Sequence, residues 1–96
     1  MASYFVPYTG KKPAALSING HRLIIVSRDR LMIEEHLEVF GADRVRRVAG
    51  VDSKVEEEVV FDQFAKLIKG GVVVAPADSD FSQVLKNLEH QLPWLQ

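Results

Sequence analysis

The chain has 96 residues, of which 47% are hydrophobic and 26% are charged, and it contains no cysteine. This length fits one small globular domain, and the missing cysteine excludes disulfides, a thiolate nucleophile and cysteine-based zinc sites. Because 12 basic residues are almost balanced by 13 acidic ones, the molecule has no overall electrostatic field that would attract nucleic acid or anionic lipid.

Residues 1–21 are predicted to form antiparallel strands. Asn19 and Gly20 lie between two apolar runs, residues 15–18 and 21–26. This pattern indicates a hairpin, because both residues of a tight two-residue turn must accept a positive φ. Residues 4–8 are predicted to add an edge strand, since Pro7 has no N–H and is tolerated there.

Residues 22–96 are predicted to form three βα units. In each unit an apolar, strand-like run gives way to a serine and then to helical spacing, and these serines are Ser27, Ser53 and Ser79. A serine in that place accepts a hydrogen bond from the first helical turn and caps the helix. The segment from Ser53 to Glu56 has the pattern of a capping box.

The apolar spacing behind each serine predicts one helix with one buried stripe. The stripes are Ile33, Leu37 and Phe40; Val60, Phe61, Phe64, Leu67 and Ile68; and Phe81, Val84, Leu85, Leu88 and Leu92. Glycines at Gly41 and at Gly70–Gly71 indicate left-handed helix ends. Residues 44–48 and 72–75 are predicted strands, and the arginines of the first are typical of a protected sheet edge.

The predicted fold class is therefore α/β, in one domain over residues 1–96. An N-terminal β-hairpin is followed by the order αβαβα, in a small mixed sheet with a parallel core. We describe this arrangement as Rossmann-like and truncated.

A ligand is expected at the carboxyl ends of the parallel strands, where helix N-termini offer free N–H groups. The candidate residues for a small anion or a nucleotide are Ser27, Arg28, Arg30, Ser53, Asp78 and Ser79. No glycine-rich phosphate loop accompanies them. Helix-capping serines with solvated arginines are therefore the competing interpretation.

A weaker candidate is a Mg²⁺ site formed by Asp52, Asp78 and Asp80, because this ion prefers carboxylate oxygens and water. The segment from Pro76 to Phe81 resembles the acidic Asp-Ser-Asp-Phe segment of the NYN and PIN-like nucleases, which implies a Mg²⁺-dependent nuclease-like domain. The resemblance covers six residues, and Ser27 stands where those families place an aspartate. Acidic residues in a first helical turn also complement the helix dipole.

No catalytic residue is predicted, and no cofactor is expected. The histidines His21, His36 and His90 lack metal-ligand or catalytic spacing, and no serine lies in a Gly-x-Ser-x-Gly motif. Nucleic-acid binding is not expected either, because Arg46 and Arg47 point to opposite faces of a strand.

Four aromatic residues lie close to the ends of the chain, namely Tyr4, Phe5, Tyr8 and Trp94. They are expected either to fold back on the core or to form a subunit contact, because aromatic residues are enriched at interfaces. The sequence thus predicts a binding or regulatory module that is not an enzyme and that self-associates or binds another protein. The longest apolar runs, four or five residues, are far too short for a membrane span, and no secretory leader is visible. A cytoplasmic location is therefore expected.

Overall fold

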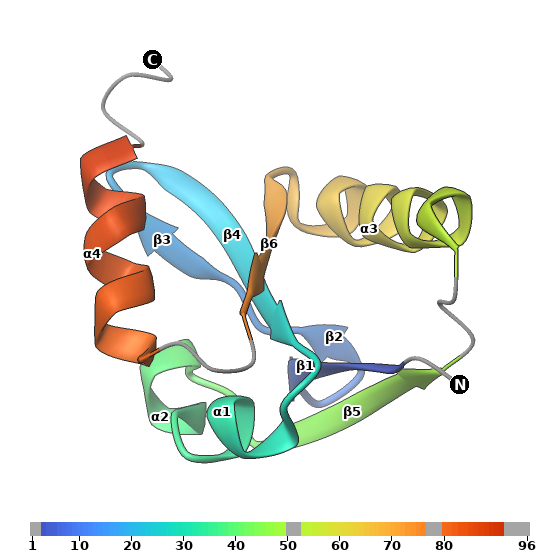
Figure 1. Cartoon of the computed structure of the whole chain (residues 1–96), viewed down its shortest axis with the longest axis horizontal. Coiled ribbons are helices and arrows are strands. Elements are labelled where there is room, and N and C mark those ends of the chain that lie inside the picture. The colour runs from blue at the N-terminus through green and yellow to red at the C-terminus, as the bar shows by residue number, and fades with distance from the viewer. Residues whose placement is uncertain (1–2, 50–52, 77–79, 92–96) are drawn as a thin grey trace.

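The computed structural model describes residues 3–49, 53–76 and 80–91. They form a small mixed α/β structure in which helices lie on both sides of a mixed sheet (Figure 1). In chain order the elements are β1 (Ser3–Thr9), β2 (Lys12–Pro13), β3 (Leu16–Ile18), β4 (His21–Ser27), α1 (Arg30–Glu34), α2 (Leu37–Phe40), β5 (Arg44–Ala49), α3 (Lys54–Ile68), β6 (Gly71–Ala75) and α4 (Phe81–Gln91).

The strands β1 and β4 form the middle of the sheet. β5 pairs antiparallel with β1, and β6 pairs parallel with β4. Between the two central strands, Phe5 of β1 is opposite Ser27 of β4, while β2 extends the ladder beside β1 and β3 extends it beside β4. Among the described strands, the parallel core is therefore the single pair β4 and β6, and β1 separates this pair from β5.

The predicted hairpin is confirmed. Ile18 is opposite His21, so Asn19 and Gly20 form a two-residue loop between β3 and β4. Their φ angles are 51° and 84°. Both φ angles are positive, as required by the turn type whose twist matches the right-handed twist of the flanking strands.

The prediction that residues 4–8 form an edge strand is wrong, because β1 has partners on both sides. Pro7 is tolerated there for a local reason. Its carbonyl accepts a hydrogen bond from the N–H of Ala14 at 2.8 Å. The N and O atoms of one strand residue face the same side, so the nitrogen of Pro7 faces away from β5 and removes no bond from the β1–β5 ladder.

The sheet separates two hydrophobic clusters. α1, α2 and α4 cover one face, and α3 covers the other (Figure 1). The first cluster includes Ile25, Ile33, Phe40, Phe81 and Leu88, and the second includes Tyr4, Val6, Ile24, Phe64 and Ile68. Strand residues alternate between the clusters, as the pleat requires.

Two of the predicted helices differ in detail from the structure. The helix expected after Ser27 is divided into α1 and α2, with Glu35 and His36 between them. Gly41 ends α2 in the left-handed conformation, as predicted, with a φ of 65°. At the end of α3, however, Lys69 adopts this conformation, with a φ of 55°, and Gly70 does not.

The glycine at position 70 has a different function. A Cβ atom there would overlap the backbone carbonyl of Arg22, at the start of β4. The missing side chain thus lets the turn between α3 and β6 approach β4 closely. None of the described helices is long and apolar enough to cross a membrane.

Candidate functional site

The carboxyl ends of three strands lie at one edge of the sheet, as the sequence predicted. β1 is antiparallel to both β4 and β5, and β6 is parallel to β4. The strands β4, β5 and β6 therefore run in the same direction and end at Ser27, Ala49 and Ala75. We call this end of the sheet the carboxyl edge, and the opposite end, where β4 begins, the amino edge. These two names refer to the ends of the strands and not to the unpaired sides of β5 and β6.

The first of the three predicted serine caps is wrong. Ser27 is fully buried, and its Oγ accepts a hydrogen bond from the N–H of Asp29 at 3.0 Å. The carboxylate of Asp29 instead caps α1, because it accepts the N–H of Leu31 at 3.1 Å. β4 continues through Ser27, so the helix begins later than the sequence suggested.

The second cap is confirmed. Ser53 accepts the N–H of Glu56 at 3.2 Å, and its hydroxyl donates to the Glu56 carboxylate at the same distance. At the start of α4, the Asp80 carboxylate accepts the N–H of Ser82 and its carbonyl accepts that of Val84, both at 3.0 Å. Asp80 therefore acts as the cap, whereas Asp78 and Ser79 lie outside the described residues.

The two arginines of the predicted anion site contact the protein itself. The Arg28 guanidinium lies over the Tyr4 ring, 4.2 Å from its centroid, and donates to the Tyr4 hydroxyl at 3.1 Å. That hydroxyl in turn donates to Glu57 of α3 at 2.6 Å. Arg30 forms an exposed ion pair with Glu34 at 3.4 Å.

The environment of Tyr4 changes its acidity. Burial raises the pKa of the phenol above its ordinary value of 10.0, and the hydrogen bond to Glu57 raises this pKa as well. The Arg28 charge acts in the opposite direction and is the smaller influence. The phenol therefore stays protonated and links β1, the residue that follows β4, and α3.

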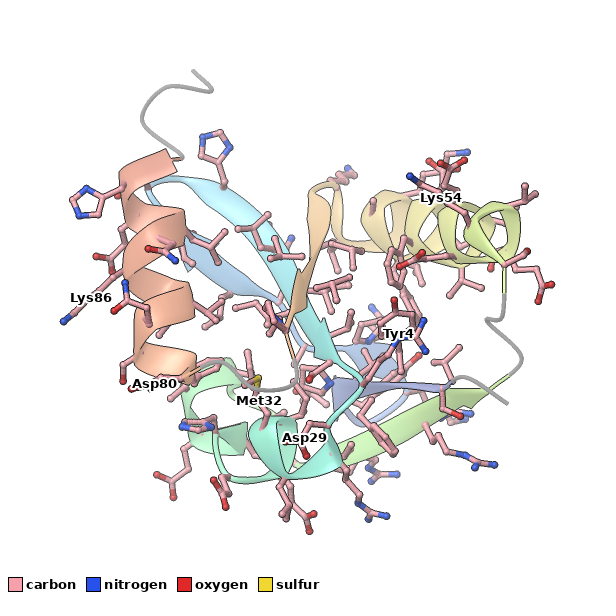
Figure 2. All side chains as sticks on the ribbon, in the orientation of Figure 1. Tyr4, Asp29, Met32, Lys54, Asp80 and Lys86 are labelled. Atoms are coloured by element: carbon pink, nitrogen blue, oxygen red, sulfur yellow. The ribbon has the colours of Figure 1, made fainter. Side chains whose placement is uncertain are left out.

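A groove of about 330 Å³ opens between α1 and the start of α4. It is lined by Asp29, Leu31, Met32, Glu35, His36, Asp80 and Phe81. Figure 2 shows Asp29, Met32 and Asp80 on the same side of the molecule. The His36 ring stacks on Phe81 with centroids 4.3 Å apart, and its Nδ1 lies 2.9 Å from the Met32 carbonyl oxygen.

This groove is acidic, and none of the residues predicted to bind an anion lines it. It presents three carboxylates, those of Asp29, Glu35 and Asp80, and negative groups close together repel a phosphate. Residues 3–49, 53–76 and 80–91 contain no group of three His, Asp or Glu side chains that could hold a metal ion. Asp52 and Asp78 of the predicted Mg²⁺ site lie outside these ranges.

The N-terminal aromatic residues pack on the core of their own chain. Tyr4 and Tyr8 are buried and Phe5 is half-buried. Tyr4 makes an edge contact with Phe61 of α3. Tyr4 and Tyr8 therefore have little exposed surface for the predicted subunit contact, and Trp94 lies outside the described residues.

Two of the described strands that pair on one side only, β5 and β6, have opposite characters. β5 carries three exposed arginines, Arg44, Arg46 and Arg47, and the Arg46 guanidinium lies 5.1 Å from the centroid of the Tyr8 ring. β6 is Gly-Val-Val-Val-Ala and has no charged residue. Val74 is 40% exposed, and no described strand pairs with the outer side of β6.

Sequence reasoning missed the β6 edge, because it assigned this strand to a parallel βα unit without predicting the order of the strands. The available signal was the uncharged run between Gly70 and Pro76, which differs from the arginine-rich strand at 44–48. No protein family, no curated protein and no solved structure matches the chain. The geometry above is therefore the basis for a functional inference.

Proposed function

We propose that the protein is a non-catalytic binding module that self-associates through the open edge of β6. The observation that carries this proposal is the uncharged edge strand with its exposed Val74. An open strand presents backbone N–H and C=O groups that can pair with another strand, and proteins usually block such pairing with charges, as β5 does. The β6 edge has no such protection.

The simplest assembly is a symmetric dimer in which β6 pairs antiparallel with β6 of a second copy. A two-fold axis uses the same surface on both copies, so the contact closes and does not grow into a filament. Antiparallel strands exchange backbone hydrogen bonds. The two sheets would form one continuous sheet.

The charges near β6 favour the antiparallel arrangement. Lys69 precedes β6 at the amino edge, and Asp80 follows it at the carboxyl edge beside Asp29 and Glu35. Antiparallel pairing brings Lys69 of one copy to the end at which Asp80 of the other copy lies. Parallel pairing would instead place groups of like charge at each end.

The test is sedimentation equilibrium on the whole chain and two matched variants. We expect the wild type to exceed its monomer mass of 10.8 kDa at micromolar concentration. Val74→Lys should be a monomer, since a charge on an edge strand opposes pairing. Val59→Lys should associate like the wild type, because this valine is 53% exposed on α3 and is not part of the β6 edge.

Circular dichroism should show that both variants keep the native secondary structure, because both valines are already open to solvent. A wild-type protein that remains a monomer at every concentration would contradict the proposal. Association of Val74→Lys as strong as that of the wild type would contradict it equally.

A further inference from the structure

A second feature lies at the amino edge, on the face of the sheet that α3 covers. A cavity of about 200 Å³ is lined by Lys12 and Pro13 of β2, Arg22 of β4, and Leu67 and Ile68 of α3. These three elements are brought together only by the fold. The cavity therefore could not be recognised from any one segment of the sequence.

The cavity has an uncompensated positive charge. It is lined by two cations and no carboxylate. Among the described residues, neither Lys12 nor Arg22 has an ion pair or a side-chain hydrogen bond, whereas Arg30 and Lys66 each pair with an acid four residues away in their helices. Two free cations that line one cavity favour an anion.

The rest of the lining is apolar. Ile68 and Pro13 are buried, but Leu67 is 63% exposed although it borders this cavity. A ligand that covers Leu67 would remove apolar surface from water, which is favourable. The cavity thus combines a site for charge with a site for a hydrocarbon group.

A larger hollow of about 440 Å³ shares Arg22 with this cavity and contains no carboxylate. Its other lining residues are Gly20, His21, Leu23, Lys69, Gly70 and Gly71. Lys69 stands at the end of α3, where a cation complements the helix dipole. It is therefore explained without a ligand. The inference consequently depends on Lys12 and Arg22, which belong to strands.

We infer that this cavity binds a small amphiphilic anion, a carboxylate joined to a short apolar chain. Arg22 would hold the carboxylate through paired hydrogen bonds, with Lys12 as a second positive group. The chain would lie against Leu67 and Ile68. The volume is below the range of about 300–1,000 Å³ typical of sites for larger ligands, so a chain of a few carbon atoms fits best.

This inference goes beyond the proposed self-association and uses a different surface. It also differs from the anion site predicted from the sequence, because that site is at the carboxyl edge. Loss of self-association in Val74→Lys should leave the cavity unchanged. The two proposals can therefore fail separately.

The test is a titration of the whole chain with hexanoate, followed by two-dimensional amide NMR. We expect saturable shifts centred on Arg22, Leu67 and Ile68. Arg22→Gln should weaken hexanoate binding by about fivefold to tenfold, because a charge-assisted hydrogen bond is lost. Lys12→Gln should weaken it less, because Lys acts as a point charge.

The control variants are Arg30→Gln, whose parent side chain pairs with Glu34, and Lys86→Gln on the outer side of α4 (Figure 2). Both should bind hexanoate like the wild type. Acetate tests the apolar wall, because it has the same headgroup without the chain. It should bind more weakly than hexanoate, and Leu67→Ser should reduce the difference.

Three outcomes would overturn the inference. One is the absence of saturable shifts at millimolar hexanoate. Another is equal weakening by Lys86→Gln and Arg22→Gln, which would indicate general charge attraction. The third is equally strong binding of hexylammonium, which has the same chain and the opposite charge.

Discussion

At the scale of single residues, the hydroxyl of Tyr4 makes a contribution that can be separated from that of its ring. Tyr4→Phe keeps the buried ring and removes the hydrogen bonds with Glu57 and Arg28. We expect a loss of about 1 kcal/mol in the free energy of unfolding, measured by urea denaturation. Tyr8→Phe is the matched control. Its ring is also buried, but no described group bonds its hydroxyl, so its stability should stay close to that of the wild type.

The Tyr4 pKa gives this comparison a pH dependence. Because the pKa is higher in the folded state than in the unfolded chain, folding retains a proton that the unfolded chain loses. The resulting stabilisation is complete below the ordinary value of 10.0 and declines as the pH rises above it. The stability advantage of the wild type over Tyr4→Phe should therefore shrink in alkaline buffer. An advantage that grows there would show that the assumed direction of the pKa change is wrong.

At the scale of elements, the junction of α3 with β6 depends on Gly70. In Gly70→Ala the new methyl group would meet the Arg22 carbonyl, and backbone atoms cannot rotate away as a side chain can. Overpacking of this kind costs typically about 1–3 kcal/mol, and we expect a loss of that size in thermal or urea unfolding. In Gly71→Ala the nearest atom is Leu23 Cδ2 at 3.4 Å, an ordinary contact. This variant should therefore be much less affected, and equal losses would contradict the assignment.

The elements that the sequence predicted well are those set by neighbouring residues. The Asn19–Gly20 hairpin and the Ser53 cap depend on interactions within four residues, so their patterns were sufficient. The start of α1 was misplaced because the end of β4 is set by pairing with β1 and β6, which are distant in the sequence. For the same reason, the position of β1 between β4 and β5 was not predictable from its own residues.

The candidate site was likewise predictable from the sequence only in part. The direction of β4, β5 and β6 follows from the βα connections and was predicted. The negative charge of the groove was not predicted, because it depends on side chains from separate helices. These are Asp29 and Glu35 around α1 and Asp80 at α4. The contact of Arg28 with Tyr4 spans 24 residues. It occupies an arginine that the sequence alone left available for a ligand.

At the scale of the whole molecule, charge is distributed unevenly between the two ends of the sheet. The carboxyl edge holds the groove with Asp29, Glu35 and Asp80, while cations from β2, β4 and the end of α3 line the cavities at the amino edge. A net charge of -1 therefore conceals two local fields of opposite sign. Association should weaken at high salt if these fields orient the two copies, because salt screens exposed charges.

The difference between the two sheet edges leads to a prediction for hydrogen exchange. If copies associate through β6, raising the protein concentration should slow exchange at alternate amides of residues 71–75, because only alternate N–H groups of a strand face outward. The amides of β5 should not change, because its arginines oppose pairing. Val74→Lys serves as the control, and its β6 amides should exchange at the same rate in dilute and concentrated samples. Slower exchange at β5 alone would place the contact on the basic edge, and exchange that is independent of concentration at both edges would show that neither strand is a contact between copies.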